Sequence, residues 1–330
     1  MRPVRVDPAG MTGPTPGQAR GRSWRRTSWG LHVPASAADS PEQRAVEQSA
    51  RLPPDGAVTG WAALRLAGAN FFDGFEVDGR TRIPVLLAVG ADTKVRGDGA
   101  ATVTREPLTA EEVVVRYGVP CTRAIRALFD EMRRVADWRE AVVAMDMAAA
   151  ADLVSILQMR AYARERSRWR RARQVLHALD YASELSRSPN ESRMRLVWVV
   201  DARLPSPLVN REVFARGGRL VGVADLFDPV AGLVGEYDGA DHRSAGRHGR
   251  DVAREEAFRR LGLEYVKVTG PDLPRRELVV DRVLGARDRA RFLPPEQRAW
   301  ELRPRPGRTL DELLEEKAVL RELYESADAG

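Results

Sequence analysis

The stretch from residue 208 to residue 268 places the strongest constraint on the fold. Three short apolar runs typical of strands are separated by turns rich in glycine and proline. A helical run follows and ends at Gly262, as a left-handed C-terminal cap would. The successive elements are Leu208–Phe214, Arg219–Phe227, Leu233–Tyr237, Arg247–Leu261 and Tyr265–Val268. This order predicts a compact α/β (α+β) domain, in which a three-strand meander continues through a helix to a fourth strand.

The length of 330 residues predicts two globular domains with tails. We expect an Arg/Pro/Gly-rich disordered leader first, and then a mostly helical α+β domain that ends in an Arg-rich helix. The second domain follows Pro189, which disfavours helix before it, and an acidic helical tail closes the chain. The expected segments are residues 1–45, 46–186, 187–295 and 296–330.

Within residues 46–200 the pattern predicts both strands and helices. Residues 83–89 and 101–105 are typical of strands, and Thr109 is expected to begin a helix with two glutamates in its first turn. Apolar spacing predicts helix from residue 122 to 150 and one long Arg-rich helix from about 161 to 185. Asn190 is expected to cap a further helix that reaches about Val200.

Charge is unevenly distributed, although the net charge is only +6. Residues 1–30 contain six Arg and one Asp, and residues 160–173 contain seven Arg and one Glu. Residues 308–330 carry three basic and seven acidic residues. Two positive blocks beside an acidic tail indicate a localised anionic partner, and a solvated Arg-rich face is the alternative.

Arginines at several helical angles can follow phosphates, and an aromatic side chain among them can stack on a base. Trp169 is in such a position, or it anchors the helix to the core. The candidate nucleic-acid contacts are Arg164, Arg168, Arg171, Arg193 and Arg243.

The single cysteine, Cys121, excludes an intramolecular disulfide and a Cys-rich zinc site. It suits a reducing compartment, and no secretory signal or membrane-length apolar run is recognisable. We therefore expect a cytoplasmic protein without a membrane partner. With four histidines, a metal site would depend mainly on oxygen ligands, which magnesium prefers.

Acidic residues end two neighbouring strands of the expected meander. Asp225 lies on one strand, and Glu236 and Asp238 share one face of the next, because side chains alternate along a strand. Two carboxylates held close together repel each other, and a divalent cation removes that cost. His242 follows closely enough to serve as a base or a phosphate contact. An Asp-Gly turn with a capping carboxylate is the structural alternative.

Several motifs, in order, resemble the very-short-patch-repair-like branch of the PD-(D/E)xK nuclease superfamily. They are NESRMR at 190–195, VADLFDP at 223–229, EYDGADHR at 236–243, the helix with Asp251 and Arg254, and YVKVTGPDL at 265–273. The resemblance implies a restriction-endonuclease-like α-β-β-β-α-β domain. It also implies that Mg²⁺ or Mn²⁺ is bound there and that DNA phosphodiesters are hydrolysed.

The superfamily pattern assigns roles to individual positions. Its three acids match Glu191, Asp225 and Glu236, with Asp225 and Glu236 as the metal ligands. The lysine expected two residues after the second acid is replaced by Asp238. His242 and Lys267 are the candidate substitutes, and Lys267 in an ion pair is the structural alternative. Glu191 has a structural alternative too, because a carboxylate in a first helical turn stabilises the helix dipole.

The N-terminal domain resembles the AbiE-type antitoxin family of abortive-infection systems. The motifs are GWAALRLAGANFFDG at 60–74, IPVLLAV at 83–89 and TRAIRALFDEMR at 122–133. The resemblance implies DNA binding or regulation, and core packing is the alternative for these apolar segments.

These observations together predict a magnesium-dependent endodeoxyribonuclease whose partner is DNA. The alternative is a non-catalytic DNA-binding regulator of antitoxin type, and a third reading is an interaction protein whose tails bind. A homodimer and a toxin-like or repair partner are left open.

Overall fold

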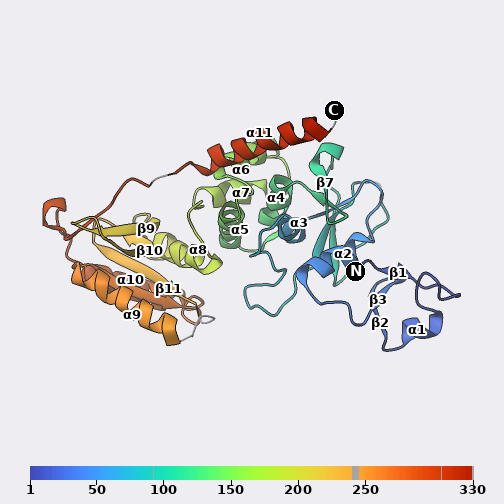
Figure 1. Cartoon of the computed structure of the whole chain (residues 1–330), viewed down its shortest axis with the longest axis horizontal. Coiled ribbons are helices and arrows are strands. Elements are labelled where there is room, and N and C mark those ends of the chain that lie inside the picture. Colours follow the sequence, from blue (N-terminus) through green and yellow to red (C-terminus); the bar gives the residue numbers. More distant parts are fainter. Residues whose placement is uncertain (92, 240–244, 306, 329–330) are drawn as a thin grey trace. The chain divides into compact units, whose positions relative to one another are not determined.

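A computed structural model describes residues 1–91, 93–239, 245–305 and 307–328, and it contains both helices and mixed sheets (Figure 1). The chain forms two compact units. Unit 1 consists of Met1–Ala136 and Gln158–Leu176, and unit 2 consists of Asp137–Leu157 and His177–Gly330. Helices α6 (Ile156–Glu165) and α7 (Ala172–Leu179) each begin in one unit and end in the other.

The contact boundary therefore differs from the single division expected near residue 186. Helix α5 (Trp138–Ala150) belongs to unit 2, because its buried Asp146 binds two residues of α8 (Pro189–Leu196). Asp146 Oδ2 accepts hydrogen bonds from Ser192 Oγ and Arg195 Nη2, both at 2.6 Å. A buried ion pair between two helices is not visible in their separate apolar patterns.

The first 45 residues, expected to be disordered, contain regular structure. Three short antiparallel strands pair in the order β1-β3-β2, and one helical turn precedes β2. The elements are β1 (Val4–Arg5), α1 (Pro16–Arg20), β2 (Trp24–Ser28) and β3 (Leu31–Pro34). Polar contacts attach this sheet to α2 (Pro41–Ser49), since Arg25 forms two bonds to Glu47, at 2.7 and 2.9 Å.

A five-stranded mixed sheet forms the centre of unit 1, with the order β6-β5-β4-β8-β7. The strands are β4 (Ala57–Thr59), β5 (Val85–Ala88), β6 (Ala101–Thr104), β7 (Val113–Arg116) and β8 (Val119–Thr122). The strand predictions at 83–89 and 101–105 thus coincide with β5 and β6. Helices α3 (Gly60–Leu66) and α4 (Ala124–Arg134) pack against each other and carry many buried side chains.

Two helix predictions in this region are wrong. Thr109 caps only the short 3₁₀ turn η1 (Ala110–Glu112), because the β-branched residues that follow form β7 and pair with β8. The long Arg-rich helix is interrupted between α6 and α7, where Arg171 has a φ of 63°. The Arg171 guanidinium bonds the carbonyl oxygens of Arg134 and Ala136, so a tertiary contact fixes the interruption.

Unit 2 contains the meander predicted from the sequence. Strands β9, β10 and β11 are antiparallel neighbours, β12 pairs parallel with β11, and the sheet order is β12-β11-β10-β9-β13. The strands are β9 (Leu208–Ala215), β10 (Leu220–Asp228), β11 (Leu233–Asp238), β12 (Glu264–Thr269) and β13 (Trp300–Glu301). The crossover between β11 and β12 contains α9 (Ala245–Arg260), and Gly262 after it has the expected positive φ of 76°.

Two apolar cores cover the two faces of this sheet. Trp198 of the π-helix η2 (Val197–Asp201) packs on one face with α8 and α10 (Arg276–Arg289). Phe258 of α9 packs on the other with Tyr265 and Trp300. The remaining elements are η4 (Pro295–Gln297) and the acidic helix α11 (Leu310–Asp328). Within the described residues, no helix has both the length and the apolar character that crossing a membrane requires.

Candidate functional site

The predicted acidic pair lies where β10 and β11 diverge. The antiparallel ladder joins Asp228 to Leu233 and Leu226 to Gly235. One step further along both strands are Asp225 and Glu236. There the N–H of Tyr237 donates to Asp225 Oδ2 at 2.8 Å. The Asp225 carboxylate therefore lies between the two strands.

Asp225 is half-buried, and its surroundings disfavour the ionised form of its carboxyl. Burial, followed by the charge of Glu191, raises the pKa of Asp225 to about 6, although the Tyr237 N–H and the charges of Arg254 and Arg187 oppose this. A carboxyl in this state holds a proton close to neutral pH and gains from a nearby cation.

Glu236 is 2% exposed and forms an ion pair with a residue of α9. Arg254 of α9 donates from Nη2 to Glu236 Oε2 at 2.5 Å. Burial and the charge of Glu236 also raise the pKa of the neighbouring Tyr265 hydroxyl. In the sequence, Arg254 belongs to the motif helix with Asp251, and no partner is predicted for it. Its approach to β11 depends on the crossover, which the helix pattern alone does not show.

Glu191 lies in the first turn of α8 and has a local structural role. Its N–H donates to Ser188 Oγ at 3.2 Å, so Ser188 and not Asn190 is the cap of this helix. Its Oε2 accepts from the Arg187 N–H at 2.9 Å and from Asn210 Nδ2 at 2.8 Å. Because its charge acts on Asp225, Glu191 belongs to the same site as well.

Lys267 and Asp238 share the face of the sheet that α9 covers. The β11–β12 register places Lys267 beside Glu236, and its Nζ lies 3.6 Å from Asp238 Oδ2. Both side chains are partly exposed, at 33% and 48%. Lys267 thus forms the ion pair that the sequence left as its structural alternative. His242 and Arg243, two further predicted site residues, lie outside the described residues.

The predicted arginine contacts fall in different parts of the chain, with Arg164, Arg168 and Arg171 in unit 1 and Arg193 in unit 2. Arg193 pairs with Glu140 at 2.7 Å, and Arg171 supports the backbone between the α6 and α7 helices. Arg164 and Arg168 are exposed. Trp169 packs inside unit 1, with the guanidinium carbon of Arg126 4.6 Å from its ring centroid. The anchoring role expected as an alternative therefore agrees with the position of Trp169.

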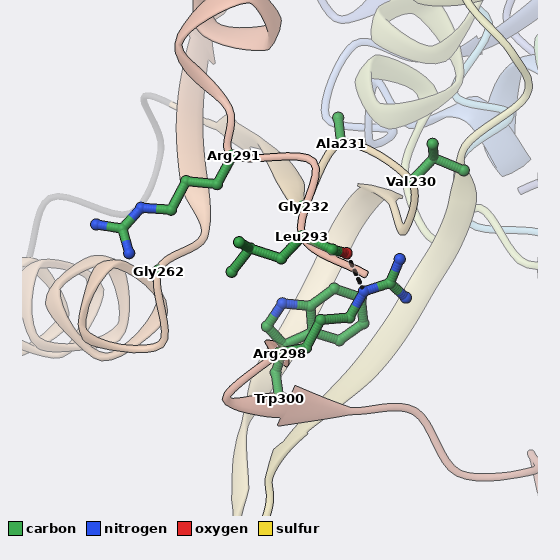
Figure 2. A pocket seen from close by; sticks show the side chains of 8 residues that line it. All are labelled: Val230, Ala231, Gly232, Gly262, Arg291, Leu293, Arg298 and Trp300. Atoms are coloured by element: carbon green, nitrogen blue, oxygen red, sulfur yellow. Dashed lines mark hydrogen bonds between the residues drawn. The ribbon is translucent and has the colours of Figure 1, made fainter. Parts of the chain in front are cut away.

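A small pocket lies at the opposite end of β11, away from the acidic pair. The β10–β11 turn, Leu293 and Trp300 line it, and the guanidinium of Arg298 lies over the Trp300 ring at 4.7 Å (Figure 2). Arg298 Nε also donates to the Leu293 carbonyl at 2.8 Å. The pocket lining contains no carboxylate, so this pocket does not extend the acidic site.

No protein-family model matches the chain, and neither a curated protein nor a solved structure is similar to it at a significant level. Among the described residues, no three His, Cys, Asp or Glu side chains are grouped closely enough to hold a metal ion. The nuclease and antitoxin resemblances therefore stay predictions. The geometry supplies two adjacent acids, a third acid that acts on Asp225 by charge, and one arginine paired to Glu236.

Proposed function

We propose that unit 2 is a metal-dependent endonuclease domain of restriction-endonuclease-like type, which hydrolyses DNA phosphodiesters. The observation that carries the proposal is the position of Asp225 and Glu236 at the diverging ends of adjacent strands. The order helix, three strands, helix and strand, from α8 to β12, supports the restriction-endonuclease-like assignment. Apolar residues would stabilise both strand positions better if the positions served only folding.

The donor set suits a hard cation such as Mg²⁺ or Mn²⁺. Asp225 and Glu236 offer carboxylate oxygens. The pKa of Asp225 is raised by burial and then by the charge of Glu191, and a bound cation would offset both costs. A bound cation would lower the pKa of a water molecule and polarise the phosphate. The chain's own residues then have separate tasks: Asp225 and Glu236 hold the ion, and Glu191 adds negative potential through its charge on Asp225.

Arg254 is our candidate for the cation that replaces the missing lysine. It already contacts Glu236, and its guanidinium can donate to a carboxylate and to a phosphate oxygen at once. Lys267 is the weaker candidate, because its ammonium group lies near Asp238. Arg254 would orient the phosphate and balance the charge that develops on it.

The decisive experiment is a cleavage assay on supercoiled plasmid with Mg²⁺, Mn²⁺ or EDTA. We expect metal-dependent nicking by the full chain and a loss of at least about 100-fold in Glu236→Gln and Asp225→Asn. Glu256→Gln is the matched control, because Glu256 is an exposed carboxylate on α9 that pairs with Arg260 of the same helix. Equal cutting by Glu236→Gln and the wild type would refute this site.

A non-catalytic DNA-binding regulator is the second candidate, favoured by one observation. Each acid of the pair already has an internal partner, Tyr237 N–H for Asp225 and Arg254 for Glu236. In this reading the acids hold the strands and α9 together. Metal-independent, salt-sensitive DNA binding by the full chain, without any cleavage, would support it.

A further inference from the structure

Three arginines from separate segments of unit 2 gather beside the acidic site. They are Arg187 before α8, Arg211 on β9 and Arg305 in the segment before α11. Asn210 connects them to the site, since its neighbours Val209 and Arg211 pair with Leu226 and Ala224. Asn210 is therefore placed opposite Asp225 on β10.

Hydrogen bonds to backbone carbonyls hold the Arg211 and Arg305 guanidinium groups in place. Arg305 Nη2 donates to the carbonyl oxygens of Val209 and Asn210, each at 2.9 Å. Arg211 donates to the carbonyl of Arg303. Arg187 donates its backbone N–H to Glu191 at 2.9 Å, which leaves its exposed side chain at the rim of the site.

The charges of Asp225 and Glu212 reach Arg187 and Arg305, but among the described residues the cluster has no directly paired carboxylate. In the part of the chain that the structure describes, no carboxylate forms an ion pair with any of the three guanidinium groups, and the buried Arg211 Nε has no hydrogen-bond acceptor. Burial, and then the charges of Arg211 and Arg187, lower the pKa of Arg305, while Glu212 acts in the opposite direction. Three like charges held together in this way favour a polyanion.

From this geometry we infer that Arg187, Arg211 and Arg305 form a subsite for backbone phosphates of duplex DNA. The subsite would hold phosphates next to the one that reaches Asp225 and Glu236. This inference rests on the proposed function for the identity of the polyanion. It assigns the DNA contacts to arginines other than those that the sequence singled out.

The test measures binding of a fluorescent 30-bp duplex to the full chain in EDTA, where no metal-dependent cleavage interferes. The variant Arg187→Gln/Arg305→Gln is compared with Arg216→Gln/Arg219→Gln. This control is matched, because Arg216, like Arg305, bonds two backbone carbonyls, those of Pro295 and Glu296, and Arg219 is exposed like Arg187. Both variants remove two positive charges.

We expect the first variant to bind about 10-fold more weakly, and the slope of log K against log salt to fall by about 2, since each lost phosphate contact changes it by about 0.9. The control should bind like the wild type. Equal losses in both variants, or no DNA binding by the wild type, would overturn the subsite. Arg187→Gln alone should lower the slope by about 1, which keeps the test valid if the double variant unfolds. Binding that depends on the cluster without any cleavage in Mg²⁺ would overturn only the nuclease proposal.

Discussion

Asp130 of unit 1 and Asp225 of unit 2 are both carboxylates enclosed by protein, but their partners differ. Asp130 is fully buried and accepts hydrogen bonds from Arg126, Arg133 and Thr59, each at 2.9 Å. Asp225 accepts one from a backbone N–H and is repelled by Glu191. The first arrangement is compensated within the fold, whereas the second leaves negative potential that a ligand can use.

The largest effect should come from removing the compensated acid. Asp130→Ala leaves Arg126, whose side chain is 0% exposed, without its main counter-charge. Arg126 would then depend on Glu112 at 3.1 Å, and Arg133 on the partly exposed Glu106 at 3.2 Å. We expect unit 1 to lose about 3–4 kcal/mol of unfolding free energy, because breaking a buried ion pair on one side is strongly destabilising. Urea unfolding monitored by circular dichroism measures this loss.

Asp39→Ala is the control, since Asp39 and its partner Arg82 are both more than half exposed. Such surface pairs contribute roughly 0–1 kcal/mol. If Asp130→Ala also costs less than about 1 kcal/mol, the Asp130 network does not stabilise unit 1 more than a surface ion pair does.

Asp225→Asn is expected to increase the unfolding free energy, and not to lower it, in the absence of divalent cations. Burial and Glu191 raise the pKa of Asp225 to about 6, so the folded chain keeps a proton that the unfolded chain releases. Stability is therefore lost as pH rises from the ordinary pKa of an Asp to about 6, and the asparagine variant avoids this loss. We expect it to be more stable than the wild type by about 1–3 kcal/mol at pH 8 and equal to it below pH 4.

Thermal melts at both pH values measure this difference. Addition of Mg²⁺ should raise the melting temperature of the wild type and leave that of Asp225→Asn nearly unchanged. A variant less stable than the wild type at pH 8 would show that Asp225 serves the fold.

The surroundings of Asp130 and Asp225 show which features could be predicted from the sequence and which could not. The strands of unit 2 and the adjacency of Asp225 and Glu236 follow from alternation and short turns, both local properties. Arg126 and Arg133 pair with Asp130 along one helix, which is also a local pattern. Other partners are not local: Thr59 reaches Asp130 from 71 residues away, and Arg254 reaches Glu236 across a crossover. The predicted disordered leader failed for the same reason, because contacts with α2 order it.

Glu131 is a buried acid of unit 1 that, like Asp225, has a raised pKa. Burial raises the pKa of Glu131 to about 7, and its Oε2 accepts the Trp61 N–H at 2.9 Å. As for Asp225, the folded chain keeps a proton that the unfolded chain releases, so stability is lost as pH rises from the ordinary pKa of a Glu to about 7. Glu131→Gln should stabilise the chain by about 1–2 kcal/mol at pH 9, since it keeps an acceptor for Trp61 but removes the charge.

DNA cleavage and binding should be unchanged in Glu131→Gln, because Glu131 contacts the start of α3 and not a ligand. pH-dependent melts together with the plasmid assay check both expectations. Loss of DNA binding in this variant would assign a functional acid to unit 1 and favour the regulator proposal.

The smallest effect on stability should come from Lys267→Ala. Lys267 and Asp238 are partly exposed and 3.6 Å apart, so their pair contributes less than about 0.5 kcal/mol. Cleavage by this variant should stay within about 3-fold of the wild type, whereas Arg254→Gln should reduce it by about 100-fold, since Arg254 contacts Glu236 directly and the Lys267 ammonium lies near Asp238. Rates measured under single-turnover conditions separate this effect from DNA binding. If the lysine variant is the inactive one, the catalytic cation reaches the site from β12, and the Arg254–Glu236 pair then serves to hold α9 against the sheet.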